Sequence, residues 1–116
     1  MKRLLVAPIA QMLLLAQFGE ACAAGPFDGD WTGSATSTVG RCKPANVTLI
    51  VQGREVSGQA RFEADAPKIN GTVREDGSFG ATIGWQPLTG SFIEDRFEGT
   101  FKSADCVWKM LLQRTK

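Results

Sequence analysis

Apolar and polar side chains alternate along most of the chain from Trp31 onward, the period expected of strands with one buried face. Short polar or glycine-containing stretches interrupt the alternation and divide it into eight runs. The runs cover residues 31–36, 47–52, 56–63, 69–74, 78–85, 88–92, 96–102 and 106–112. No helical period of apolar residues appears between them. The pattern therefore predicts an all-β domain of eight strands.

The stretches between the runs are short, which favours antiparallel pairing of successive strands. Residues 52–54 and 75–77 each contain a glycine that can take a positive φ, and Asp76-Gly77 is a strong hairpin signal. Residues 94–95 and 103–104 are two-residue connections, and 38–45 is the longest connection. We expect a small up-and-down barrel.

Five runs contain a glycine at a mid-strand position that faces the core. These are Gly33, Gly58, Gly71, Gly90 and Gly99. Glycine weakens a strand interior, so its repeated use needs a reason. A narrow closed sheet supplies one, because inward glycine lets strands coil sharply and leaves room for neighbouring rings. The alternative is a glycine-lined groove that binds a ligand.

Large aromatic residues dominate the predicted interior. The inward rings are Trp31, Phe62, Phe79, Trp85, Phe92, Phe97, Phe101 and Trp108. An eight-stranded barrel is just wide enough to be filled by side chains or to hold one small ligand. We therefore expect a filled interior without a large cavity.

Some apolar residues fall on the outward face instead. They are Ile50, Ile93, Val107 and Leu111. Scattered exposed apolar residues are ordinary in soluble proteins, whereas a contiguous set would indicate a partner or dimer surface.

The first 24 residues differ from the rest. A basic head at Lys2 and Arg3 is followed by an uncharged apolar stretch over 4–18 and by small residues up to Ala24. This three-part order is typical of a secretory signal peptide. The alternatives are a membrane anchor, for which the apolar stretch is short, and a lipoprotein signal at Cys22, for which the preceding residues fit poorly. We expect cleavage after Ala23 or Ala24, a single domain over 25–116, and a periplasmic or secreted location.

Cleavage would remove Cys22 and leave Cys42 and Cys106 as a pair. In an oxidising compartment such a pair is expected to form a disulfide, although two separate thiols are the alternative. Removing residues 1–24 from a chain with 13 basic and 12 acidic residues leaves eleven of each. A neutral domain argues against nucleic acid as a partner, because that binding needs clustered cations. No transmembrane segment is expected after cleavage, and the oligomeric state stays open.

The residues needed for most catalysis are missing from the sequence. It contains no histidine and no tyrosine, which removes the commonest general base and most metal sites. No phosphate-binding or dinucleotide-binding motif is present. The carboxylates fall in turns or on outward faces, where solvated surface charge explains them: Glu55, Glu63, Asp65, Glu75, Asp76, Glu94, Asp95 and Glu98. We expect no enzyme, no metal and no cofactor.

Two segments are candidates for the rim of the barrel. Trp85 and Pro87 place an aromatic ring and a proline at one rim, where they form either a ligand mouth or a plug of the core. Arg41 and Lys43 flank Cys42 in the longest connection and could form a basic lip, since loops often carry function.

The opening of the predicted domain resembles that of lipocalin-type barrels. Gly29-Asp30-Trp31 is similar to their G-x-W start. In that family a basic residue of the last strand commonly packs over the tryptophan, a part that the resemblance gives to Arg114. Residues 25–116 also resemble small exported bacterial proteins of unknown function that open F-D-G-x-W-x-G. Both resemblances imply an architecture and neither implies an activity.

The sequence thus predicts an exported, non-enzymatic module that binds a ligand or another secreted or envelope protein. The alternatives are a lipocalin-like carrier of a small apolar ligand and a structural protein of the envelope. A carrier differs from the others in needing a ligand cavity of about 300 Å³ or more.

Overall fold

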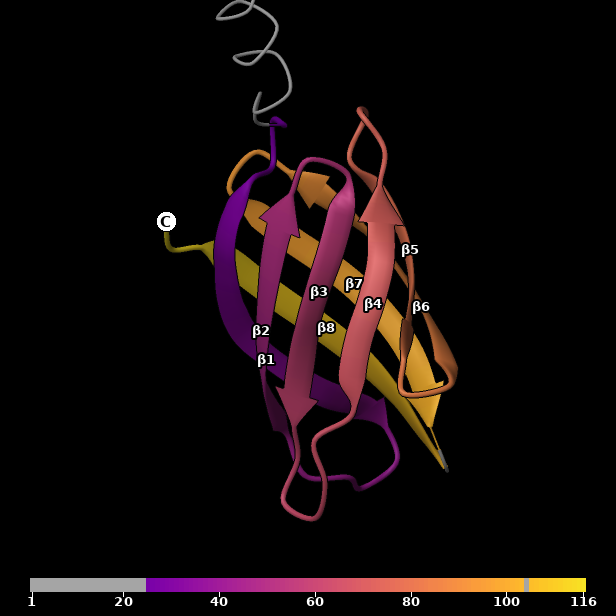
Figure 1. Ribbon diagram of the computed structural model, residues 1–116. Coiled ribbons are helices and arrows are strands. Elements are labelled where there is room, and N and C mark those ends of the chain that lie inside the picture. Colours follow the sequence, from indigo (N-terminus) through magenta and orange to yellow (C-terminus); the bar gives the residue numbers. More distant parts are fainter. Residues whose placement is uncertain (1–24, 104) are drawn as a thin grey trace, which may run out of the picture.

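The chain folds as a closed antiparallel barrel of eight strands in a computed structural model that describes residues 25–103 and 105–116 (Figure 1). The strands are β1 (Gly29–Val39), β2 (Ala45–Gln52), β3 (Glu55–Arg61), β4 (Lys68–Val73), β5 (Ser78–Ile83), β6 (Gln86–Ile93), β7 (Arg96–Ser103) and β8 (Cys106–Arg114). Each strand pairs with the next, and β8 pairs with β1 to close the sheet. The predicted fold class and strand number are confirmed. The predicted signal peptide and Cys22 lie outside the described residues.

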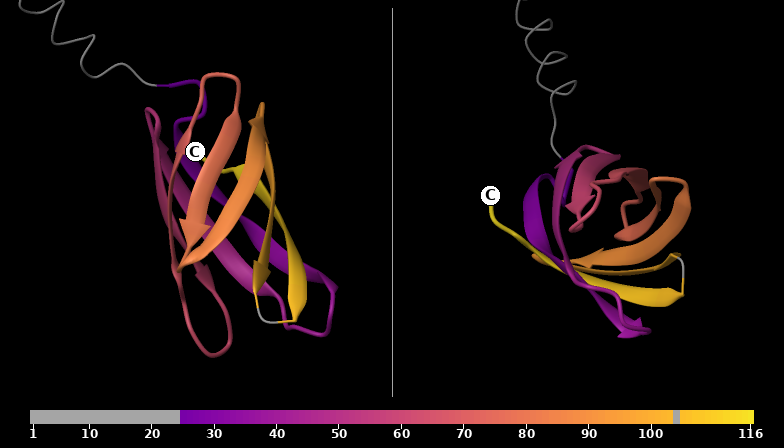
Figure 2. Two further views of the ribbon diagram at one scale, coloured as in Figure 1. Left: turned by 90° about the vertical axis from the view of Figure 1, so that its right-hand side faces the viewer. Right: turned by 90° about the horizontal axis from the view of Figure 1, so that it is seen from below.

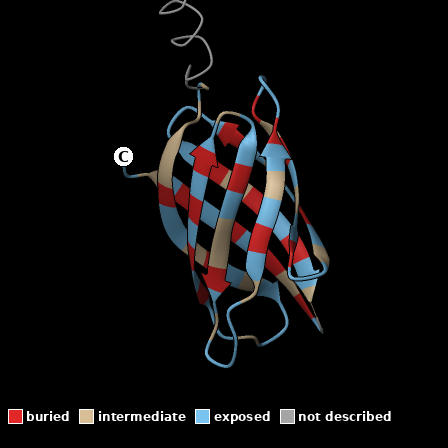
Figure 3. Ribbon diagram, in the orientation of Figure 1, coloured by how far each residue is buried: buried red, intermediate tan, exposed pale blue. Residues whose placement is uncertain are grey.

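Alternation of buried and exposed residues builds the core (Figure 3). In β2 every second residue from Ala45 to Val51 is buried, and the residues between them are exposed. This follows from the two-residue period of a strand, which sends alternate side chains to opposite faces. The buried set throughout the described chain is hydrophobic, with no buried polar or charged residue in it. No helix among the described residues is long and apolar enough to cross a membrane.

The inward glycines let neighbouring backbones and rings approach closely. Gly90 and Gly99 are cross-strand partners, and the ring of Phe97 lies over both of them. A Cβ added at Gly90 would lie 2.8 Å from Phe97 Cζ, and one added at Gly99 would lie 2.7 Å from the same atom. The pair therefore makes room for a ring, as the sequence predicted.

The same constraint gives a test with an internal control. A Cβ at Gly71 would lie 2.8 Å from Ala81 Cα, whereas a Cβ at Gly80 on the neighbouring strand would meet nothing within 4 Å. We expect Gly71→Ala to lower the free energy of unfolding by about 1–3 kcal/mol, because backbone must move. Gly80→Ala is expected to be neutral or slightly stabilising. Urea unfolding of both variants checks this, and equal losses would contradict the packing role.

The barrel has two different ends. One end, here called the closed end, carries residues 25–28 and the connections 53–54, 74–77 and 94–95. The other end, here called the open end, carries the connections 40–44, 62–67 and 84–85 and the residue before β8, Asp105. The right-hand view of Figure 2 looks at the molecule from the side of the open end.

A disulfide joins Cys42 and Cys106 at the open end, as predicted. Cys42 lies in the connection from β1 to β2, and Cys106 is the first residue of β8. Their Cα atoms are 6.4 Å apart, within the ordinary range. The bond therefore fastens the longest predicted connection to the last strand.

Candidate functional site

The open end of the barrel contains a solvent-open pocket of about 360 Å³. Its lining comes from the β3–β4 connection, the β5–β6 turn and the adjoining ends of β5 to β8: Phe62, Asp65, Pro67, Ile83, Gly84, Trp85, Gln86, Phe101, Ser103 and Trp108. The volume is at the lower end of the range for ligand sites. Apolar and aromatic side chains with a few polar groups are the usual composition of such sites.

The pocket floor is a fixed set of aromatic rings. Trp108 stacks on Phe101 with ring centroids 5.5 Å apart and planes 3° apart, and it meets Phe62 edge-on at 5.1 Å. The indole Nε1 of Trp108 donates a hydrogen bond of 3.1 Å to Ser103 Oγ, which satisfies its polar edge. Phe101 and Trp108 are buried, whereas Phe62 is partly exposed. The rings are therefore positioned before any ligand arrives.

The prediction that Trp85 faces the interior is wrong. Trp85 is 83% exposed and lies in the two-residue turn between β5 and β6. The turn comes earlier than the alternation implied because Gly84 has φ 62°, a conformation suited to the first central position of a hairpin turn. Trp85 thus stands at the rim and lines the pocket instead of filling the core.

The predicted filling of the interior holds toward the closed end and fails at the open end. Toward the closed end, Phe92 contacts the rings of Trp31, Phe79 and Phe97 at centroid distances of 4.8, 5.5 and 4.7 Å. At the open end, Trp85 was predicted to be one of the interior rings but lies outside the interior, and the pocket is located at this end.

The other predicted rim residues lie near the pocket without lining it. Arg41 and Lys43 are exposed in the β1–β2 connection at the same end. Lys43 Nζ forms an ion pair with Glu63, 3.0 Å from Oε2, which links this connection to the β3–β4 connection. Pro87 is exposed on the outside of β6, beside Lys102 and Val107. Of the four predicted residues, the structure therefore brings only Trp85 into the pocket.

Asp65 is exposed, as the prediction of solvated surface charge implies, and it also lines the pocket. The backbone explains this placement, because the carbonyl oxygen of Asp65 accepts a 2.8 Å hydrogen bond from the amide of Phe62 and turns the connection back on itself. The alternation of apolar and polar residues along the sequence gives no indication of a residue whose position depends on such a turn.

The four apolar residues predicted for the outward face are separated from one another, although Val107 pairs across strands with the exposed Val39. Ile50, Ile93 and Leu111 are exposed and Val107 is partly exposed, but no two of these four are cross-strand partners. Leu111 lies between Ser34 and Glu98, both polar. This spacing is that of scattered surface residues.

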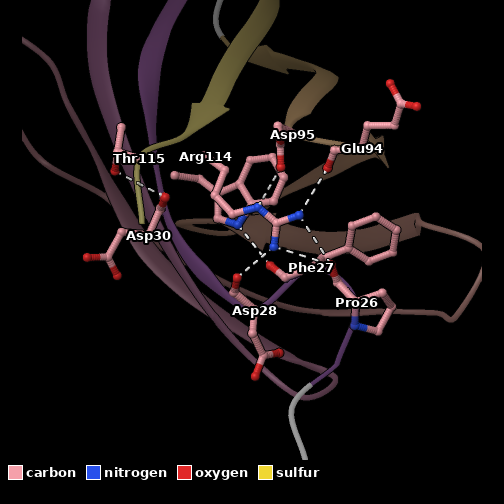
Figure 4. Close-up of polar contacts among 9 residues, drawn as sticks. Pro26, Phe27, Asp28, Asp30, Glu94, Asp95, Arg114 and Thr115 are labelled. Atoms are coloured by element: carbon pink, nitrogen blue, oxygen red, sulfur yellow. Dashed lines mark hydrogen bonds and ion pairs between the residues drawn. The ribbon is translucent and has the colours of Figure 1, made fainter.

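The closed end is held by Arg114 (Figure 4). Its guanidinium lies 4.9 Å from the ring centre of Trp31, as the family resemblance implied. It also donates to the carbonyls of Pro26, Asp28 and Glu94 at 3.2, 2.7 and 3.3 Å, and Nε lies 2.9 Å from Asp95 Oδ1. Arg114 thereby clamps the segment 25–28 over this end.

A second open depression, about 670 Å³, lies beside segment 25–27 at the closed end. Its lining includes two arginines, Arg54 and Arg74, and two carboxylates, Glu75 and Asp76, all exposed in connections between strands. Ser78 donates hydrogen bonds to Asp76 Oδ1 from its amide and hydroxyl, which lowers the pKa of that carboxyl. Phe27 is the one aromatic residue in its lining, so this depression is a weaker candidate than the aromatic pocket.

Comparison with known proteins identifies no relative: no family model, curated protein or solved structure matches this chain. The closed eight-stranded antiparallel barrel is compatible with a lipocalin-like architecture.

Proposed function

We propose that this chain is an exported, non-enzymatic binding module that receives a small apolar or aromatic group in the open-end pocket. The observation that carries the proposal is the open-end pocket, where the exposed ring of Trp85 stands beside the ordered rings of Phe62, Phe101 and Trp108. Export is supported by the signal-like residues 1–24 and by the disulfide, since such bonds persist in oxidising compartments.

The depth of the pocket favours a short ligand or the end of a larger one. Rings fill the barrel beyond Trp108, so a long apolar chain would find no enclosed channel. This argues against the lipocalin-like carrier of a wholly enclosed ligand. The separated outward apolar residues offer less support for a protein partner on the barrel wall than the pocket does for a ligand at its mouth.

Titration with a neutral aromatic solute, benzyl alcohol, tests the proposal. We expect saturable shifts in amide NMR spectra confined to residues 62–67, 84–86 and 101–103. Trp85→Ala should weaken binding because it removes the exposed ring of the rim. Ile93→Ala, which trims an exposed apolar residue near the closed end, is the matched control and should leave binding unchanged. Shifts centred on the closed end, or none, would overturn the proposal.

A further inference from the structure

Exposed apolar residues gather on the outer wall of the barrel, next to the open end. Val107 on β8 pairs across strands with Val39 on β1, which is 58% exposed. On its other side Val107 pairs with Lys102 on β7, and Lys102 borders the same surface depression as Pro87 on β6. The left view of Figure 2 shows the ends of β7 and β8 beside the β1–β2 connection at the open end. Pro87, Lys102, Val107 and Val39 therefore form one row across four neighbouring strands, here called the outer row.

Trp85 continues the outer row at its β6 end. It is 83% exposed, more than any other large hydrophobic residue that the structure describes. The pocket that it lines and the depression beside Pro87 share Gln86 and Phe101, so these two hollows are neighbours. Trp85 and the outer row together make a contiguous exposed surface with apolar character, which marks an interaction site.

The open end carries more positive than negative charge. Its exposed basic residues are Arg41, Lys43, Arg61, Lys68 and Lys102. Its carboxylates are Glu63, Asp65 and Asp105. Lys43 and Glu63 pair with each other, which leaves four cations and two carboxylates.

The wall that bears the outer row is also basic. Lys102 lies within the row, and Lys109 is exposed two positions after Val107 on β8. The strands β6 and β8 contain no aspartate or glutamate. The one carboxylate of β7, Glu98, has its Oε2 atom 3.7 Å from Nε of Arg96. An anionic partner is therefore complementary to this wall.

We infer that the outer row and Trp85 dock onto the surface of a lipid bilayer that contains anionic lipids. Tryptophan is favoured at the boundary between headgroups and acyl chains, because it has an apolar body and a polar N–H. Valine and proline side chains enter the same boundary. Lysine buries its apolar stem there while its ammonium stays among the headgroups. Each cation close to an anionic surface corresponds to roughly a fivefold gain in affinity.

A second copy of the chain fits this surface less well. A two-fold contact uses the same surface on both partners, so it would bring Lys102 and Lys109 of one copy close to those of the other. Like charges held together oppose association, whereas a bilayer meets the same cations with anionic headgroups. The contact uses the wall of the barrel and does not require a ligand in the pocket.

Sedimentation of the domain 25–116 with lipid vesicles tests the docking surface. We expect binding to vesicles that mix phosphatidylglycerol with phosphatidylcholine, and none to phosphatidylcholine alone. Binding should fall at about 0.5 M sodium chloride, because salt screens exposed charges. Trp31 and Trp108 are buried, so Trp85 reports the contact. Its emission should move to shorter wavelength on the anionic vesicles and become protected from quenching by acrylamide.

A matched pair of charge variants locates the contact. Lys102→Gln with Lys109→Gln should lower the affinity for anionic vesicles roughly 25-fold, because two cations are removed. Arg54→Gln with Arg74→Gln makes the same change in net charge at the closed end and should alter the affinity less than about twofold.

A matched pair of apolar variants tests insertion. Val39→Ser should lower the affinity about three- to tenfold, because it removes methyl groups from the acyl boundary. Ile50→Ser, at an exposed position on β2, should leave the affinity unchanged. Urea unfolding of each variant checks that the barrel is intact.

Equal losses within either matched pair would overturn the docking surface, as would equal binding to the two kinds of vesicle or binding to neither. A dimer in analytical ultracentrifugation that Val39→Ser dissociates would assign the surface to a second copy instead. Titration with benzyl alcohol judges the proposed function separately, because the variant with Lys102→Gln and Lys109→Gln should bind it like the parent domain.

Discussion

Removing the disulfide by Cys42→Ala and Cys106→Ala together is expected to lower the free energy of unfolding by about 4 kcal/mol. The two cysteines are 64 residues apart in the sequence, so the bond restricts a long loop of the unfolded chain. A small domain has a net stability of about 5–15 kcal/mol, so this loss is a large share of the total. Guanidinium unfolding of the variant and of the parent domain measures it.

Reduction supplies the control for this prediction. Dithiothreitol should lower the stability of the parent domain to that of the double variant and should leave the double variant itself unaffected. If oxidised and reduced parent domains unfold at the same denaturant concentration, the disulfide does not stabilise the barrel in the way described.

The second large effect concerns Phe92, whose side chain is 1% exposed. Its ring contacts Phe27, Trp31, Phe79 and Phe97 at centroid distances between 4.7 and 5.6 Å. Phe92→Ala would leave a cavity at the junction of these rings and is expected to cost about 3–5 kcal/mol. Equilibrium unfolding in urea checks the value.

Ile93→Ala, at the next position along β6, is the control for that substitution. Ile93 is 43% exposed on the outer face, so its truncation should change the free energy of unfolding by no more than about 0.5–1 kcal/mol. Comparable losses for the two variants would contradict the assignment of the core to the ring cluster around Phe92.

Much of the barrel could be predicted because the alternation of apolar and polar residues within each strand indicates which face is buried. The run 45–52 alternates without exception, and its residues occupy the faces that the alternation indicates. The pairing of Cys42 with Cys106 was also predictable, because only two cysteines remained in the expected mature chain. The place of Arg114 over Trp31 came from family resemblance and is confirmed.

The pocket could not be predicted from the sequence. The alternation of apolar and polar residues indicates to which face of the sheet a side chain points, but it does not indicate the residue at which the strand ends. Trp85 has the correct parity for the interior but lies beyond the last residue of β5, Ile83. Gly84 was a usable signal, since a glycine at the first central position of a two-residue turn favours the required φ. Asp65 owes its position to a main-chain hydrogen bond with Phe62, which depends on the folded path of the connection.

The pairing of β1 with β8 has a consequence for the order of folding. The first strand to leave the ribosome has the last strand as one of its two neighbours, so the sheet cannot become a ring until almost the whole chain has been made. Until then β1 and β7 each present an unpaired edge, the feature through which β proteins most readily associate with one another. Contacts between distant parts of a chain also form slowly. We therefore expect the chain to be most prone to aggregation before β8 pairs with β1 and β7, and Arg114 on β8 reinforces the closed barrel by holding Pro26 and Asp28.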